Sequence, residues 1–379
     1  MMEVKDEFYH FKYIDIKYTG DISIDKELYR ENALFEMRQK FYDILNRFNA
    51  KPKKETLKIN ADKILVRFIF SNYAGVFKKA KDGIFNYTKK TNTNSITDDI
   101  TYVFANISRE EAIEITNELN ILKLFKKAIS NIKKITPSKT QHYKKHNDYN
   151  TVYFNSLGNT HKFKMPMKIY DKLKNRYNEY KTNNKHNYKL DELIYILLLR
   201  YNTLDSGGHQ WGMPLVIKDR FRNTLHFNFE CFASALNHYY KYYCSMFYDI
   251  EKYFMSVGPF QNISYISGNY MANPPYEVSL LDNIVATFTK ALKKSNNLAF
   301  MYGLPDWSNY DETLKFLVNS EKSEYYRGNV ILEPYVYQWH DFMNYEKSHR
   351  IPQSLLYVLS TNDVKFDVIK NIMTKWKEL

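Results

Sequence analysis

Short apolar segments alternate with amphipathic helical segments from residue 204 onward, and this alternation constrains the fold more than any other feature. A helix with one apolar face is expected at 278–294. Strands buried on both faces and separated by helices are typical of an open, doubly wound α/β sheet. The sequence therefore predicts an α/β domain over residues 204–379. Its first strand is expected at 223–230, and its second strand follows a short helix and ends near residue 249. Further strands are expected at 268–273, 297–305, 328–337 and 353–361.

Residues 1–203 have a different pattern and are expected to form a mostly helical domain. Apolar residues recur at three- and four-residue spacing, which predicts helices at 25–52, at 106–137 and twice within 165–201. A capping box formed by Ser108 and Glu111 marks the start of the second of these helices. Two segments rich in β-branched and aromatic residues are predicted as strands, at 62–70 and 98–107. The polar segment 136–150 is predicted as an exposed loop.

The formal net charge of +13 is unevenly distributed along the chain. Residues 201–379 contain 17 Lys and Arg against 18 Asp and Glu, which leaves 38 basic and 24 acidic residues for the first 200. A basic excess confined to one half favours contact with a polyanion, such as a nucleic acid. The candidate phosphate-binding side chains are Lys126, Lys127, Lys133 and Lys134. A solvated helix face in a lysine-rich chain accounts for the same pattern, so both interpretations stay open.

Several classes of protein are disfavoured. Apolar runs fall short of the roughly 20 residues that span a bilayer, and the first residues lack the apolar core of a secretory signal. Two cysteines are too few for a disulfide framework, and the histidines show no metal-ligand spacing, so no metal site is expected. The sequence predicts an intracellular protein, nuclear or cytoplasmic or located in a viral factory, that is neither secreted nor bound to a membrane.

Two adjacent prolines interrupt the chain between the strand predicted at 268–273 and the helix that follows. They belong to the run Asn273, Pro274, Pro275 and Tyr276. Proline fixes its own φ, lacks an N–H and extends the preceding residue, so this run predicts a rigid turn with exposed carbonyls. The Asn273 side-chain oxygen and the Pro274 carbonyl are placed to accept both hydrogens of an amino group on an aromatic ring, with Tyr276 stacked on that ring. Such contacts make the nitrogen a better nucleophile, whereas a turn that merely ends a strand is the alternative.

Ligands of doubly wound sheets bind beyond the carboxyl ends of the strands, where a second segment, "FECFASALN", also falls. Its small and polar residues are expected to open a helix and to line a cofactor pocket. Asp249, at the end of the second strand, is expected to hold ribose hydroxyls. In the loop "SGGHQWGMP" two glycines suggest close approach of a ligand. The predicted cofactor-binding set is Gly208, Gln210, Glu230, Phe232, Ala233, Ser234, Asn237 and Asp249, with ordinary core packing as the alternative.

Four motifs occur in order: "GGHQW", "FECFASALN", "CSMFYDIEKYF" and "SGNYMANPPYE". Together they resemble the catalytic core of the phosphorylated C-terminal-domain-interacting factor 1 family, the cap-specific adenosine N6-methyltransferases. The resemblance extends over about residues 205–310. It implies a Rossmann-type class I methyltransferase domain after a helical, RNA-binding domain. It further implies S-adenosylmethionine as cofactor, capped mRNA that starts with 2′-O-methylated adenosine as substrate, and Asn273 to Tyr276 as the catalytic motif.

This sequence departs from the family pattern in three ways. Tyrosine stands at 276 where the family often has phenylalanine, and both residues stack. Alanine at 235 replaces a proline of the cofactor loop. No tryptophan pair with the spacing of a WW module occurs in the first 200 residues, so polymerase-tail binding through such a module is not expected. Two other functions stay open: a DNA adenine N6-methyltransferase, and a non-catalytic methyltransferase fold that serves as an RNA-binding subunit.

Overall fold

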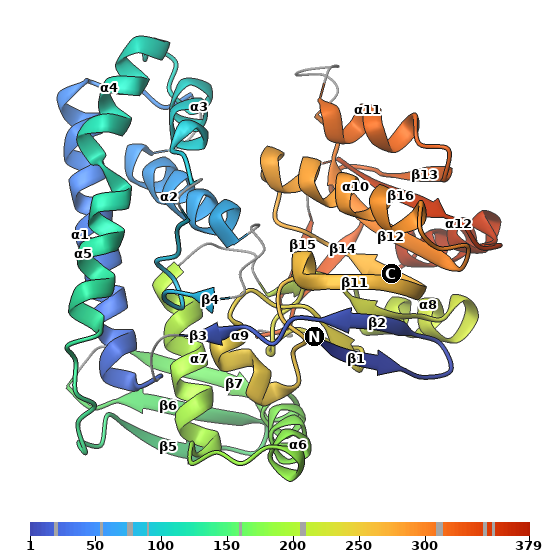
Figure 1. The fold of residues 1–379 in the computed structure, drawn as a ribbon, viewed down its shortest axis with the longest axis horizontal. Helices are drawn as coiled ribbons and strands as arrows, with labels where there is room; N and C mark the ends of the chain where they lie inside the picture. Colours follow the sequence, from blue (N-terminus) through green and yellow to red (C-terminus); the bar gives the residue numbers. More distant parts are fainter. Residues whose placement is uncertain are drawn as a thin grey trace.

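The computed structural model describes residues 1–18, 22–53, 56–73, 79–88, 91–158, 161–204, 210–307, 314–343, 347–350 and 353–379. A group of long helices stands on one side of the molecule, and a sheet flanked by helices stands on the other (Figure 1). Within the described residues, no helix combines the length and the apolar character needed to cross a membrane.

The central sheet confirms the predicted α/β class. Four strands run parallel in the order β10 (Tyr242–Tyr243), β9 (Phe227–Glu230), β11 (Ile263–Ala272) and β12 (Leu298–Pro305). Beyond β12, the antiparallel strand β16 (Ser354–Ser360) lies between β12 and β13 (Tyr326–Leu332). All eight residues of β12 are buried, as expected for a strand covered on both faces.

Helices cover both faces of this sheet. Alternate strand residues such as Phe300 and Tyr302 pack against α10 (Val278–Leu292) and α11 (Lys315–Glu321). Their neighbours Ala299 and Met301 pack against α8 (Leu215–Leu225) and α12 (Phe366–Lys377). The period-two alternation of strand side chains therefore produces three layers.

An N-terminal hairpin extends the sheet at β11. Strand β1 (Met2–Lys5) pairs with β2 (His10–Tyr13), and β2 pairs antiparallel with the first half of β11, whereas β9 pairs with its second half. Gly268 lies between the two halves with φ +121°, and a Cβ there would be 2.6 Å from the Tyr9 ring. Only glycine fits this position without displacing Tyr9.

The long helices form a separate hydrophobic core. They are α1 (Ile24–Arg47), α2 (Leu57–Tyr73), α3 (Asn94–Val103), α4 (Arg109–Leu119) and α5 (Ile121–Ile132). The predicted capping box is confirmed, because Ser108 and Glu111 each accept the other's backbone N–H. Asn120, in the left-handed conformation, divides the segment 106–137 into α4 and α5.

Two predicted strands are wrong, because 62–70 lies in α2 and 98–107 largely in α3. In α2 the residues Ala61, Ile64, Leu65 and Phe68 are fully buried, which is a helical stripe at three- and four-residue spacing. A short, nearly continuous apolar run is compatible with either a strand or a helix, and packing against α1 decides for the helix.

A small antiparallel sheet replaces much of the loop predicted at 136–150. Its strands are β5 (Tyr143–Asn147), β6 (Thr151–Ser156) and β7 (Lys162–Pro166). The predicted pair of helices follows as α6 (Met167–Asn183) and α7 (Leu190–Leu204). Helix α7 ends at the predicted boundary between 1–203 and 204–379, and that division stays a prediction.

Short elements complete the fold. Strands β8 (Trp211–Gly212), β14 (Gln338–Asp341) and β15 (Ser348–Arg350) form a three-stranded sheet, and β3 (Lys17–Tyr18) pairs with β4 (Lys79–Ala80). Between β10 and β11 the chain forms α9 (Tyr248–Glu251) and two 3-10 turns, Lys252–Phe254 and Phe260–Asn262. The helix predicted before the second strand is absent from the described residues 237–241, where the chain forms a turn.

Candidate active site

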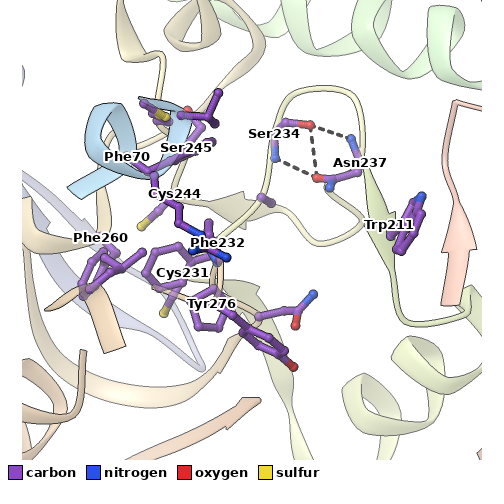
Figure 2. Close-up of a pocket in the computed structure, with 18 of the residues that line it drawn as sticks. Phe70, Trp211, Cys231, Phe232, Ser234, Asn237, Cys244, Ser245, Phe260 and Tyr276 are labelled. Carbon is purple, nitrogen blue, oxygen red and sulfur yellow. Dashed lines mark hydrogen bonds between the residues drawn. The ribbon is translucent and has the colours of Figure 1, made fainter. Parts of the chain in front are cut away.

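A cavity of about 610 Å³ lies at the carboxyl ends of β9, β10 and β11 (Figure 2). Its walls come from loop residues after each of these strands, from helix α2 and from the β8–β14 sheet. The lining side chains used below are Lys63, Arg67, Phe70, Trp211, Phe232, Ala233, Ser234, Asn237, Ser245, Phe260, Gln261, Asn273, Pro274, Pro275, Tyr276 and Trp339. The cavity therefore brings together both segments that the sequence predicted at this edge of the sheet.

The double-proline turn joins β11 to α10 and forms one wall of the cavity. The carbonyl of Pro275 accepts the backbone N–H of Glu277 at 3.0 Å, and the Glu277 carboxylate accepts the N–H of Leu280 at 2.7 Å. In the described residues no backbone N–H bonds the carbonyl of Pro274. The exposed Asn273 side chain likewise has no hydrogen bond within this part of the chain. Two acceptors of the turn are thus available to a ligand.

Tyr276 is fixed by a hydrogen bond to β16, the last strand of the sheet in chain order. Its hydroxyl donates a hydrogen bond of 3.2 Å to Oγ of Ser354, at the start of β16. Its ring makes an edge-to-face contact with Trp307 at 6.4 Å between centroids. Burial raises the pKa of Tyr276 above its usual value. The phenol therefore stays neutral at physiological pH and keeps its hydrogen for Ser354.

Gly303 of β12 leaves room beside this turn. A Cβ at residue 303 would be 3.5 Å from the Asn273 side-chain oxygen and 4.0 Å from the Tyr276 hydroxyl. A larger side chain would fill the space between these two groups, so Gly303 is a residue of the site that the sequence pattern did not single out.

The segment after β9 forms a compact turn instead of the expected helix. Asn237 Oδ1 accepts the backbone N–H of Ser234 at 2.7 Å, and Ser234 Oγ accepts the N–H of Asn237 at 3.1 Å (Figure 2). Ser234 Oγ also accepts the N–H of Leu236 at 3.1 Å. Ser234 Oγ also lies 2.7 Å from Gln210 Oε1, to which it donates. Short polar side chains that bond nearby backbone groups favour turns over helices, which explains the difference.

Glu251 fixes this turn to the loop after β10, and the sequence did not reveal that role. Its carboxylate is fully buried and accepts the N–H of Ala235 at 2.7 Å and that of Phe247 at 3.0 Å. Burial raises the pKa of Glu251, although these hydrogen bonds oppose the shift. The sequence signal for this role is weak: Glu251 is an acidic residue within a segment that is mostly apolar and aromatic.

Lys172 of α6 holds the other end of the same turn. Its ammonium donates to the carbonyls of Leu236 and His238 at 2.9 and 2.7 Å. Burial lowers the pKa of Lys172 to about 7. A helix of the first 203 residues therefore helps to shape the cavity wall.

A pair of aromatic rings in contact with each other lines part of the cavity. The rings of Phe232 and Phe260 are 4.5 Å apart between centroids, and Phe70 of α2 lies on the same side of the cavity (Figure 2). Polar side chains of Ser245 and Gln261 also line the cavity. Apolar walls with a few polar groups are typical of a site for a flat heterocycle.

Three described residues of the predicted cofactor set, Gln210, Glu230 and Asp249, do not line the cavity. Glu230 ends β9 but accepts Lys218 Nζ at 2.5 Å and the N–H groups of Tyr239 and Tyr240 at 2.7 and 3.1 Å. Asp249 lies in α9 instead of at the end of a strand and pairs with Arg200. Their contact with a cofactor stays a prediction, while the structure gives each a partner within the protein.

The loop before β8 is only partly described. Gly208 lies outside the described residues, whereas Gln210 bonds Ser234 as noted above. Trp211, which follows, lines the cavity and stacks on His349 with centroids 3.8 Å apart and planes 14° apart. Trp339 of β14 also lines the cavity.

Helix α2 closes the cavity from the helical side. Lys63 and Arg67, one turn apart, both face it. Arg67 lies 3.4 Å from the carboxylate of Asp99 on α3. Burial raises the pKa of Asp99 to about 6; Arg67 opposes that shift and the Glu277 carboxylate adds to it. The lysines predicted to bind RNA, Lys126, Lys127, Lys133 and Lys134, are exposed on or just after α5 and do not line this cavity.

Within the described residues no cluster of three or more His, Cys, Asp or Glu side chains has an arrangement that would hold a metal ion. Cys231 and Cys244 are both buried free thiols on the cavity floor, and burial raises the pKa of each.

Comparison with known proteins gives a consistent match. Residues 172–342 match the family model described as "Phosphorylated CTD interacting factor 1 WW domain". Two curated proteins from Mus musculus and Homo sapiens, each named mRNA (2'-O-methyladenosine-N(6)-)-methyltransferase, are 31% identical to the chain over 153 residues. This stretch is 38% of the chain and 21% of either relative, so the chain spans about a fifth of the length of these relatives. The resemblance expected from the sequence is confirmed.

One expectation about partners is wrong. Polymerase-tail binding through a WW module was not expected, but the family match carries the name of that module over residues 172–342. The expectation depended on a search for paired tryptophans in the first 200 residues. All four tryptophans of the chain lie beyond residue 200, and three of them, Trp211, Trp307 and Trp339, lie within the matched residues.

Proposed function

We propose that this chain, which resembles the phosphorylated C-terminal-domain-interacting factor 1 family, is an S-adenosylmethionine-dependent methyltransferase that acts on N6 of adenosine. The favoured target is the 2′-O-methylated adenosine next to an mRNA cap. One observation carries the proposal: the turn Asn273 to Tyr276 and the turn Phe232 to Asn237 line a single cavity at the carboxyl ends of adjacent parallel strands. The names of the mammalian relatives support the same activity.

The proposed fold is a Rossmann-type class I methyltransferase over 204–379, preceded by an accessory, RNA-binding region over 1–203. The parallel strands β10, β9, β11 and β12, together with an antiparallel β16 inserted before β13, support this assignment. Helices on both faces of the sheet are consistent with it.

Recognition of the adenine amino group is assigned to the double-proline turn. Asn273 Oδ1 and the Pro274 carbonyl accept one hydrogen each, which directs the nitrogen lone pair out of the ring plane and towards the methyl group. Tyr276, fixed by Ser354, stacks on the base. A carboxylate base is unnecessary before attack, because the N–H becomes strongly acidic once the nitrogen has gained the methyl group.

The cavity fits S-adenosylmethionine by size and by the chemistry of its lining. A volume of about 610 Å³ is within the range of drug-sized ligand sites. The surface offered by the Phe232–Phe260 pair suits an adenine ring, and Ser245 and Gln261 add polar groups to the lining. Ala233, Ser234 and Asn237 line the same cavity as Asn273. When bound, the cofactor supplies an electrophilic methyl group on a sulfonium sulfur.

Lys63 and Arg67 are assigned to phosphates next to the target nucleotide. Both are cationic and face the cavity from α2, and guanidinium groups bind phosphate through paired N–H groups. A terminal adenosine also avoids the few kcal/mol that extrusion of a base from a duplex costs. The relatives' names refer to mRNA, so a DNA substrate is not favoured.

The test is transfer of tritium from labelled S-adenosylmethionine to short synthetic RNAs. We expect labelling of capped RNA that starts with 2′-O-methyladenosine, and little labelling of matched capped RNA that starts with guanosine. Equal labelling of uncapped RNA would remove the cap requirement but keep the chemistry. Labelling of duplex DNA and not RNA would overturn the proposed substrate, and absence of transfer to every nucleic acid, with the cofactor bound, would overturn the enzymatic function.

A further inference from the structure

The small sheet β5–β7 presents one face to solvent. Across its three strands the register pairs Lys144 with Asn155, His146 with Tyr153, Tyr153 with Lys164 and Asn155 with Lys162. Side chains at paired positions project from the same side of a sheet. The six residues of these pairs share one side, and together they are named here the β5–β7 face: Lys144, His146, Tyr153, Asn155, Lys162 and Lys164.

The opposite side of this sheet is covered. Val152, Phe154 and Met165 are completely buried against α6 and α7, in a core that includes Leu173 and Leu197. Within the β5–β7 face, Lys144, His146, Lys162 and Lys164 are exposed, and Tyr153 and Asn155 are partly exposed. The alternation along each strand thus separates a packed side from an open one.

The charge of the β5–β7 face has one sign. Three of its six residues are lysines, and strands β5, β6 and β7 contain no Asp or Glu. None of the three lysines forms an ion pair within the described residues, in contrast to Lys145 on the other side, which lies 3.0 Å from Asp191. An uncompensated cationic surface of this kind attracts a polyanion.

An aromatic pair lies in the middle of these lysines. The rings of His146 and Tyr153 are stacked, with centroids 4.7 Å apart and planes 4° apart. Asn155 Nδ2 lies 3.5 Å from His146 Nδ1, so an amide with free hydrogen-bonding capacity adjoins the pair. Among the described residues no other ring contacts either of these two, which leaves the outer faces of the stack for a planar group.

We propose that the β5–β7 face binds single-stranded RNA. The lysines neutralise phosphates, the His146–Tyr153 stack holds an unpaired base, and Asn155 offers a donor and an acceptor to a base edge. Duplexes fit this surface less well because their bases are already stacked within the helix. The occupant is the body of the transcript beyond the methylated nucleotide, and this identification rests on the proposed function.

The test measures binding of a fluorescein-labelled, unstructured 12-nucleotide RNA by fluorescence anisotropy at several salt concentrations. Affinity for RNA falls with salt, so the slope of log affinity against log salt is negative. The triple variant Lys144→Ala, Lys162→Ala, Lys164→Ala should make this slope shallower by about 2. The double variant His146→Ala, Tyr153→Ala should bind between about 5- and 100-fold more weakly, with little change in slope. The control replaces Lys290, Lys293 and Lys322, three lysines around a groove between α10 and α11, by alanine. Thermal unfolding verifies that each variant is folded.

Three outcomes would overturn the proposal: an equal effect of the control triple, unchanged binding by the aromatic double variant, or stronger binding of an acidic phosphorylated peptide than of RNA. Methyl transfer separates this inference from the proposed function. With a capped dinucleotide the variants should match the parent protein, whereas with a capped 12-nucleotide RNA their KM should rise. RNA binding that depends on the β5–β7 face in a protein without any transferase activity would support the inference and reject the function.

Discussion

Arg200 of α7 and Asp249 of α9 form a buried ion pair, with Nη2 3.1 Å from Oδ2. The same guanidinium donates to both carboxylate oxygens of Glu27 on α1 at 2.6 Å. One side chain thus joins the helical region to the loops beyond β10, which carry part of the cavity wall.

This pair makes a stability prediction. Arg200→Met should lower the free energy of unfolding by about 3–5 kcal/mol, because Asp249 would remain buried without its cationic partner and Glu27 would keep only Arg30. Urea unfolding followed by circular dichroism measures the change. The control is Arg109→Met, whose partner Asp98 is exposed and whose loss should cost at most about 1 kcal/mol. Equal effects of both substitutions would show that the buried ion pair contributes no more to the free energy of unfolding than the exposed one.

Asn273→Ala should lower kcat for methyl transfer by about 100-fold or more, because one of two positioned acceptors is lost. Affinity for the 12-nucleotide RNA should stay within about twofold, since the side chain is exposed and has no partner within the described residues. Asn273→Asp retains an oxygen acceptor and should keep more activity than the alanine variant. Undiminished turnover by Asn273→Ala would refute the assigned role of the turn.

Tyr276→Phe and Tyr276→Ala separate the hydroxyl from the ring. The phenylalanine variant loses only the hydrogen bond to Ser354 and should be less stable by about 1 kcal/mol with nearly normal kcat. The alanine variant loses the stacking surface, so its KM for RNA should rise about tenfold or more. Ser354→Ala should reproduce the phenylalanine variant. Similar kinetics of the phenylalanine and alanine variants would argue against stacking.

Glu251→Gln tests whether this carboxylate shapes the cofactor site. A glutamine oxygen replaces only one of the two acceptors that now bind Ala235 and Phe247, so one loop should loosen. Loss of a hydrogen bond to a charged group predicts a rise of about tenfold in the Kd for S-adenosylmethionine. Isothermal titration calorimetry measures this Kd, and an unchanged value in a folded protein would assign Glu251 to stability alone.

Asp99 gives the active site a pH dependence. In the folded protein this carboxyl takes up a proton as the pH falls through about 6, whereas the unfolded chain retains the ordinary value of 3.8. Its contribution therefore favours the folded state as the pH falls from about 6 towards 4. Protonation also releases Arg67 for phosphate, so RNA affinity should rise up to about fivefold in this window. Asp99→Asn should remove that component, and an identical pH profile in both proteins would contradict the assignment.

Much of the sheet was predictable because its strands are apolar on both faces. Strands β12 and β16 were located almost to the residue, since each combines a continuous apolar run with flanking turn residues. The position of the double-proline turn after β11 followed from the chemistry of proline itself. These features depend on a few neighbouring residues, which is why local pattern sufficed.

The rest depended on contacts between distant segments. Helix α2 was mistaken for a strand, and its contribution to the cavity through Lys63 and Arg67 was therefore missed. Glu251 acquires its role from two loops, one of them 16 residues away. The β5–β7 face was overlooked because a strand with one polar side looks like a loop when the covering helices are unknown.

Strand β11 pairs with both β2 and β9, so β2 cannot complete its pairing until β11 has been synthesised. The hairpin β1–β2 leaves the exit tunnel early, but residues 263–267, with which β2 pairs, are translated far later. At ordinary elongation rates the delay is roughly ten to fifty seconds. Throughout that interval the side chain of Phe11, which is fully buried in the folded protein, stays exposed to solvent. During this interval a nascent chain exposes the unpaired edge of the β1–β2 hairpin, and chaperones can bind it there.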